Sequence, residues 1–115
     1  MENLSVNRVE LRGRIGQEPK ISTVNGARVC KFSLATSEIY KDRNGDIKED
    51  TTWHNITVWS SKNINDFSMI QKGVMVTVQG RIRNVKYTTP DGEEHRFVEI
   101  LANAVTPFVQ PQAAL

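Results

Sequence analysis

The sequence predicts an all-β fold with a small α component: a five-stranded barrel with one helix between the third and fourth strands. Stretches in which apolar and polar residues alternate recur along the whole chain, as is typical of half-buried strands. Only one stretch, 60–73, has apolar residues at helical spacing. The length of 115 residues fits a single domain.

The N-terminal half is expected to form hairpins. An alternating strand at 8–15 carries a charged outer face, and a short strand at 20–24 leads into Asn25-Gly26. Asn-Gly between alternating segments is the strongest short-range signal for a two-residue hairpin. A strand at 28–37 follows, and the polar stretch 38–50 is expected to be a long exposed hairpin loop.

The next strand, 51–59, contains both tryptophans of the protein. Side chains alternate between the two faces of a strand, so Trp53 and Trp59 share one face while Ile56 and Val58 share the other. Ile56 and Val58 are the evident core pair. Both tryptophans are therefore expected on the face opposite the core.

The stretch 60–73 predicts the helix. Ile64, Phe67 and Ile70 recur at helical spacing, and Gly73 is typical of the position just after a helix.

The C-terminal part predicts two more strands. One runs over 74–87, with a bulge or bend at Gly80, and the other over 94–104. We expect the domain to cover 1–105 and a short tail to cover 106–115.

With the short 20–24 strand set aside, the order is three strands, one helix and two strands. This order fits the five-stranded Greek-key OB-fold barrel. The order alone leaves other small α+β barrels open.

Composition narrows the setting of the protein. The net charge is +2, only mildly basic, so the placement of charge is more informative than its sum. Cys30 is the only cysteine, which excludes an internal disulfide, and its apolar neighbourhood predicts a reduced core thiol. Neither a signal peptide nor a membrane-spanning run is evident, so we expect a cytoplasmic protein.

Catalysis is poorly supported by the residues. His54 and His95 lie in different strands, and the sequence contains no metal-spaced Cys/His set and no serine elbow. No glycine-rich loop leads from a strand into a helix. The acidic residues of 38–50 are typical of a solvated loop. We therefore expect no enzyme activity, no cofactor and no metal.

Aromatic and basic residues together favour nucleic-acid binding. Tyr40, the pair Trp53 and Trp59, and Tyr87 lie on three separate segments, each near basic residues. Such rings stack on unpaired bases, and Lys and Arg neutralise phosphates, so the surface should prefer single strands. The alternatives are that the tryptophans pack under a loop or a subunit partner, and that the tyrosines are ordinary surface residues. The expected phosphate contacts are Lys41, Arg43, Lys62, Arg81, Arg83 and Lys86.

A series of motifs resembles the bacterial single-stranded DNA-binding protein family, in order and over about 6–104. They are Asn7-Arg8-Val9 with Leu11 and Gly13, Gly16-Gln17-Glu18-Pro19, Asn25-Gly26, Phe32-Ser33-Leu34-Ala35-Thr36-Ser37, Thr52-Trp53-His54-Asn55, Lys72-Gly73 and Val78-Gln79-Gly80-Arg81-Ile82-Arg83.

The resemblance implies an OB fold and sequence-independent binding of single-stranded DNA in replication, recombination or repair. It also implies self-association, usually as a homotetramer, with a dimer as the other option. The family's four base-stacking positions fall on Tyr40, Trp53, Trp59 and Tyr87, and its interface histidine falls on His54.

Two features depart from the family pattern. No acidic cluster is present at 110–115, so recruitment of replication proteins through an acidic tip is not expected. Glu10 and Arg12 occupy first-strand positions that are usually apolar in the family, on a strand that often helps to build its dimer. Two rivals remain: a tail-less primosomal-type adaptor that acts through protein contacts, and a nuclease that uses the same surface as a substrate groove.

Overall fold

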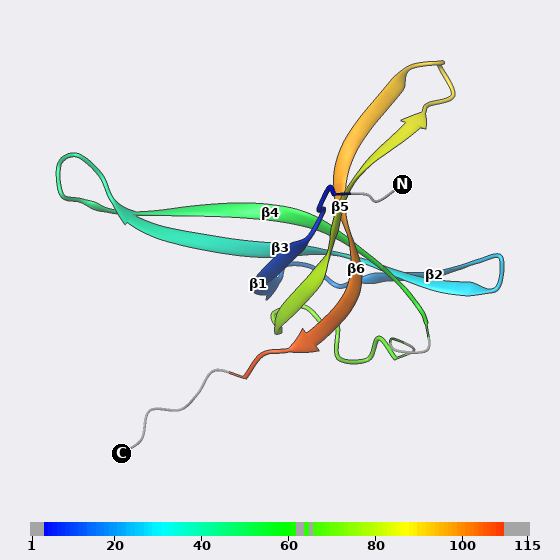
Figure 1. Ribbon diagram of the computed structural model, residues 1–115, viewed down its shortest axis with the longest axis horizontal. Coiled ribbons are helices and arrows are strands. Elements are labelled where there is room, and N and C mark those ends of the chain that lie inside the picture. Colours follow the sequence, from blue (N-terminus) through cyan, green and yellow to red (C-terminus); the bar gives the residue numbers. More distant parts are fainter. Residues whose placement is uncertain (1–3, 62–63, 65, 110–115) are drawn as a thin grey trace.

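The computed structural model describes residues 4–61, 64 and 66–109, which form six strands (Figure 1). These are β1 Val9–Ile15, β2 Lys20–Val24, β3 Ala27–Lys41, β4 Ile47–Trp59, β5 Met75–Thr88 and β6 Glu94–Pro107.

Five of the strands close into a barrel. The order is β1-β5-β6-β4-β3, and pairing of Ile15 with Leu34 joins β3 back to β1. All neighbours are antiparallel except β4 and β6, which run parallel through Ile56 and Ile100. Among the described residues β2 pairs with β3 alone, and it lies outside the closed barrel. The predicted all-β five-stranded barrel is confirmed.

The core fills the barrel with alternate side chains of the strands. Ile56 and Val58 of β4 are buried, as their alternation with the tryptophans predicts. Cys30 is fully buried in the same cluster, and this burial raises the pKa of its thiol to about 11. Phe67 and Ile70, from the segment between β4 and β5, complete the cluster.

The predicted helix at 60–73 is wrong. The described residues of this segment form turns, with Ile70 N–H donating to the Phe67 carbonyl and Val74 N–H donating to the Gln71 carbonyl. The Asp66 carboxylate also accepts the backbone N–H of Ser68, and side chains of this type compete with helical backbone bonding. The apolar residues are buried as expected, but a series of turns presents them to the core.

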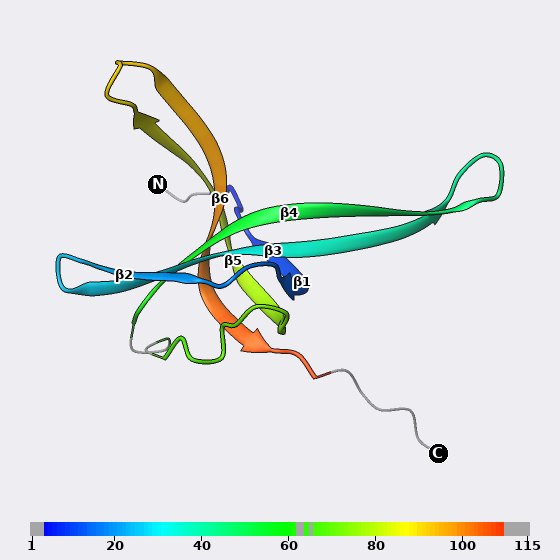
Figure 2. The ribbon, with the colours of Figure 1, turned by 180° about the vertical axis from the view of Figure 1, so that it is seen from behind.

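The predicted long loop at 38–50 is also wrong. β3 continues to Lys41 and β4 begins at Ile47, so only 42–46 forms the turn. The resulting hairpin projects from the barrel, and the β5–β6 hairpin projects in another direction (Figures 1 and 2). The radius of gyration is consequently 17.3 Å, whereas about 13 Å is usual for a compact chain of this length.

The irregularity predicted at Gly80 is confirmed. The β5–β6 register shifts between Gln79 and Gly80. A Cβ added at Gly80 would collide with the backbone carbonyl of Leu101, so the close approach of the two strands requires glycine here. Within the described ranges, no helix is long and apolar enough to cross a membrane.

Candidate nucleic-acid interface

Four neighbouring strands, β3, β4, β6 and β5, present one continuous surface away from the core. Pairing aligns Ser33 with Asn55 across β3 and β4, and Arg83 with Glu99 across β5 and β6. The Thr57 hydroxyl donates to the Glu99 carboxylate over 2.7 Å, which joins β4 to β6 on the same side. We call this surface the outer face; it carries Lys31, Ser33, Trp53, Asn55, Thr57, Trp59, Arg81, Arg83, Val85, Tyr87, His95, Phe97 and Glu99.

Both tryptophans lie on the outer face with exposed rings. Trp53 is 60% exposed and Trp59 37%, whereas the alternate residues Ile56 and Val58 are buried. The predicted orientation of the two tryptophans is therefore confirmed. Neither ring is hidden under a loop of the described chain.

The position of the Trp53 ring depends on the absence of a side chain at Gly16. It extends across β3 toward Gly16, where an added Cβ would collide with the far edge of the indole. Gly16, Gln17 and Ser33 line the shallow hollow around the ring. Glycine at position 16 thus leaves room for the indole to lie along the surface.

Tyr87 lies near the end of the β5–β6 hairpin and is held by neighbouring rings. It stacks on His95, with centroids 5.2 Å apart and planes 20° from parallel. Phe97 makes an edge contact with Tyr87 at 6.0 Å. Tyr87 is still 48% exposed, so one side of a preformed stack remains open.

Tyr40 differs from the other three predicted platform residues. It lies opposite Lys48 in an uninterrupted ladder, so alternation places it on the ladder face of His54 rather than that of Trp53. This part of the hairpin lies beyond the barrel, where both faces are open, and the Tyr40 ring is 52% exposed.

Two of the predicted phosphate contacts are engaged by carboxylates. Arg83 Nε donates to Glu99 Oε1 over 2.9 Å, and Glu99 is only 3% exposed. Lys86 Nζ lies 2.8 Å from Glu94 Oε1 at the surface. Arg83 therefore compensates a buried negative charge, because an unpaired buried carboxylate is costly.

The remaining predicted cations fall into two groups. Lys41, Arg43 and Arg81 are exposed and form no ion pair within the described part of the chain. Lys62 lies outside the described residues.

A groove of about 280 Å³ lies on the outer face between the aromatic groups. Lys31, Asn55 and Phe97 contribute to its lining, together with Lys20 from β2. Sequence reasoning assigned no function to Lys20, Lys31, His95 or Phe97. These residues could have been found from the hairpin turns. The turn at 25–26 sets a strand register that aligns Lys20 with Lys31, and the β5–β6 turn sets one that aligns Tyr87 with His95.

Comparison with known proteins identifies the family. The family model of the single-strand binding protein family matches residues 6–108. The chain belongs to the single-strand binding protein family. A Neisseria meningitidis single-stranded DNA-binding protein is 43% identical over 101 residues, which are 87% of this chain and 58% of that protein. The corresponding Xylella fastidiosa protein is 33% identical over 99 residues, 85% of this chain and 60% of that protein.

Solved structures of single-strand binding proteins share the fold. A Plasmodium falciparum SSB in complex with ssDNA superposes on this chain with a TM-score of 0.82 and is 35% identical to it. The aligned region is 95% of this chain and 100% of the Plasmodium falciparum chain. A deletion mutant of the Thermus aquaticus single-stranded DNA binding protein, 19% identical, has a TM-score of 0.76, over 90% of this chain and 51% of that chain. The chain spans less than two thirds of the length of the curated relatives cited above.

His54, the predicted interface residue of this single-strand binding family member, lies on the face opposite the tryptophans. It is half-buried beside Leu34, and its Nε2 lies 2.9 Å from the Thr36 hydroxyl. His54 at a subunit interface stays a prediction.

Metal-dependent chemistry has no evident site in the part of the chain that the structure describes. No group of three or more His, Cys, Asp or Glu side chains there is arranged to hold a metal ion. The exposed chemical groups of the outer face are rings, cations and neutral polar groups, and the one acid named for that face, Glu99, is buried and bonded to Arg83 and Thr57. This set suits binding rather than bond cleavage.

Proposed function

We propose that this protein binds single-stranded DNA without sequence preference and protects it during replication, recombination or repair. Bases stack on Tyr40, Trp53, Trp59 and Tyr87, and cations of the outer face and the β3–β4 hairpin contact the phosphates. The complex of the Plasmodium falciparum relative with ssDNA supports this proposal.

The single observation that carries the proposal is the outward orientation of both tryptophans. Burial of these rings would stabilise the domain, yet Trp53 and Trp59 remain exposed on the surface that also carries Tyr87 and Arg81. Rings exposed beside cations suit unpaired bases, whose faces are accessible, and do not suit duplex DNA, whose base faces are stacked inside.

The second candidate, a tail-less primosomal-type adaptor that acts through protein contacts, is not favoured. An adaptor has no need of exposed aromatic residues at all four platform positions, and this chain retains them. We also propose self-association, as a homotetramer or a dimer, and a cytoplasmic, nucleoid-associated location.

The experiment is a titration of intrinsic tryptophan fluorescence with unlabelled oligo(dT), in parallel with duplex DNA, at low and high salt. We expect strong quenching by the single strand only, weakening as salt rises, because phosphate neutralisation releases counterions. Absence of quenching, or an equal response to duplex, would contradict the proposal and place the adaptor function first.

Substitution then locates the surface. Trp53→Ala and Trp59→Ala should each weaken binding by about 1–3 kcal/mol while the fold is retained. Ile47→Ala is the matched control, since Ile47 is an exposed apolar residue on the β3–β4 hairpin and belongs to no proposed platform. Normal affinity of both tryptophan variants would show that the binding surface lies elsewhere.

A further inference from the structure

The groove on the outer face lies between the ring of Trp53 and the ring group of Tyr87 and Phe97. The proposed function leaves open how a strand passes from one to the other. Trp53 adjoins it through Ser33 and Gln17, which line both the groove and the hollow around the indole. On the other side, Phe97 lines the groove and contacts Tyr87. A strand passing from Tyr87 to Trp53 would cross this groove.

We propose that the groove is a nucleotide subsite in which a base stacks on Phe97 and the adjoining phosphate lies between Lys20 and Lys31. This inference rests on the proposed binding of single-stranded DNA. It adds a fifth stacking ring and two phosphate contacts to that surface.

The size of the groove fits one nucleotide unit. Its volume of about 280 Å³ lies just below the range for small-molecule sites, roughly 300–1,000 Å³. Ser33 and Asn55 line it as neutral polar groups that donate and accept hydrogen bonds. Such a lining accepts any base edge, as sequence-independent binding requires.

The charged side chains that line the groove favour the binding of an anion. Lys20 and Lys31 face each other directly across the β2–β3 ladder, and like charges in this position repel. Within the described residues neither ammonium forms an ion pair, although Glu18 lines the same groove. The other acid of the groove, Glu99, is already neutralised by Arg83. A bound phosphate would relieve the repulsion between the two lysines.

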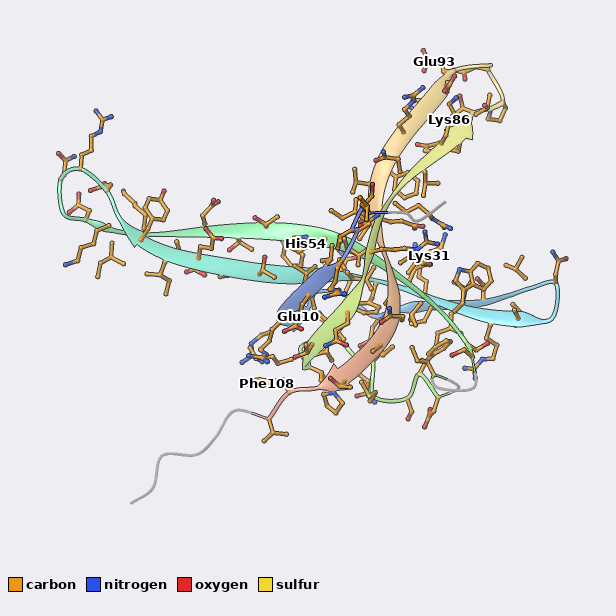
Figure 3. The ribbon with its side chains drawn as sticks, viewed as in Figure 1. Glu10, Lys31, His54, Lys86, Glu93 and Phe108 are labelled. Carbon is orange, nitrogen blue, oxygen red and sulfur yellow. The ribbon has the colours of Figure 1, made fainter. Side chains whose placement is uncertain are left out.

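Fluorine NMR tests the ring without altering the fold. The chain has four phenylalanines, Phe32, Phe67, Phe97 and Phe108, and 4-fluorophenylalanine labels all of them. Phe32 and Phe67 are buried, while Phe108 lies under Arg12 near the C-terminal end of β6, away from Lys31 (Figure 3). We expect oligo(dT) to shift the Phe97 resonance and to leave that of Phe108 unchanged, with assignment by Phe97→Tyr and Phe108→Tyr.

Substitution tests the energetics of the subsite. Phe97→Leu keeps an apolar side chain but removes the ring, and it should weaken binding of oligo(dT) about 5-fold or more. Phe108→Leu is the matched control and should bind as wild type. A plot of log K against log salt has a negative slope. Lys31→Gln should make this slope shallower by about 0.7, because one phosphate contact is lost.

The outcomes separate the two proposals. If the wild-type protein fails to quench with oligo(dT), both the function and the subsite are overturned. If it quenches and depends on Trp53, but the Phe97 resonance and the Phe97→Leu affinity are unchanged, only the subsite is overturned. If Phe97→Leu fails to fold, the fluorine shift in the wild-type sequence decides alone.

Discussion

The β3–β4 and β5–β6 hairpins have closely similar turns but very different surfaces. In the first turn, Gly45 N–H donates to the Asp42 carbonyl over 3.1 Å, and in the second Gly92 N–H donates to the Thr89 carbonyl over 2.9 Å. Both glycines have positive φ, 82° and 89°. The Asp42 carboxylate accepts the backbone N–H groups of Asn44 and Asp46, and the Asp91 carboxylate accepts that of Glu93.

The side chains beyond these turns are organised differently. On the β5–β6 hairpin, Tyr87 is stacked on His95 and Lys86 is paired with Glu94. On the β3–β4 hairpin, Tyr40 and Lys41 have no ring contact or ion pair among the residues described. One hairpin thus presents a preformed platform, while the other must order its side chains when a strand binds, at a cost in entropy.

The second turn also has a side-chain hydroxyl donor, that of Thr89. The Thr89 hydroxyl, together with the Glu93 backbone N–H, holds the pKa of the Asp91 carboxyl below its ordinary value of 3.8. A lowered carboxyl pKa stabilises the folded state above the unfolded-state pKa, and this contribution disappears as the pH falls through the folded-state pKa. The Asp91 carboxylate therefore keeps its hydrogen bonds in this turn throughout the neutral range.

The largest effect is expected from breaking the anchor of the preformed hairpin. Arg83→Ala leaves the buried Glu99 carboxylate with the Thr57 hydroxyl as its one remaining hydrogen-bond partner among the described residues. We expect a loss of about 2–3 kcal/mol in the free energy of unfolding, below the usual cost for a buried pair because the Arg83 side chain is 43% exposed. Urea denaturation followed by circular dichroism measures it.

Two variants test the cause of this loss. Arg81→Ala, on the same strand and face but without an ion pair in the described chain, should leave stability almost unchanged. Adding Glu99→Gln to Arg83→Ala should recover part of the loss, because it removes the uncompensated charge. Equal destabilisation by Arg81→Ala would contradict the role assigned to Arg83.

The next effect compares the two tyrosines directly. Tyr87→Leu removes a ring that is already positioned and should weaken single-strand binding by about 1–3 kcal/mol. Tyr40→Leu should cost less, under about 1 kcal/mol, because ordering its free ring offsets part of the stacking energy. Fluorescence anisotropy with a labelled oligonucleotide at fixed salt measures both.

Conservative variants serve as controls here. Tyr87→Phe and Tyr40→Phe keep the rings and should bind as wild type. A loss at Tyr40 equal to or larger than that at Tyr87 would show that preorganisation does not determine the contribution of these residues.

The smallest effect concerns the cations of the two hairpins. Lys41→Gln and Arg43→Gln should each make the negative slope of log K against log salt shallower by about 0.7, as expected for an unpaired cation that contacts one phosphate. Lys86→Gln should change it by less, because the charge of Lys86 is already partly compensated by Glu94. Arg14→Gln on β1, outside the outer face, is the control, and a Lys86 effect equal to that of Lys41 would contradict the distinction.

Much of the candidate site was predictable because it depends on local periodicity. Alternation along β4 predicted the outward tryptophans, and the alternation is confirmed by the burial of Ile56 and Val58. The same reasoning failed at 60–73, where Ile64, Phe67 and Ile70 have spacing that a helix and a series of turns can both bury. Spacing of apolar residues reports which residues are buried, not which backbone hydrogen bonds form.

The registers of the hairpins were predictable from the sequence, but the burial of the paired side chains was not. The turn at 89–93 determines that Arg83 lies opposite Glu99 and Tyr87 opposite His95, so these pairs were available from the sequence. The ion pair of Arg83 with Glu99 was nevertheless not foreseen, because a pairing across a ladder does not show that its acidic member is buried; the phosphate contact of Arg83 stays a prediction.

Outside 38–50, the sequence by itself determined the strands, their hairpins and the alternation of side chains between the two faces, since these depend on neighbours in the chain. Only the tertiary structure decided that β4 runs beside β6 and that β1 closes on β3. That closure brings Thr57 to Glu99, 42 residues away, and forms the groove between Asn55 and Phe97. The physical reason is that the barrel buries the apolar faces of all five strands at once, a long-range condition that no local pattern contains.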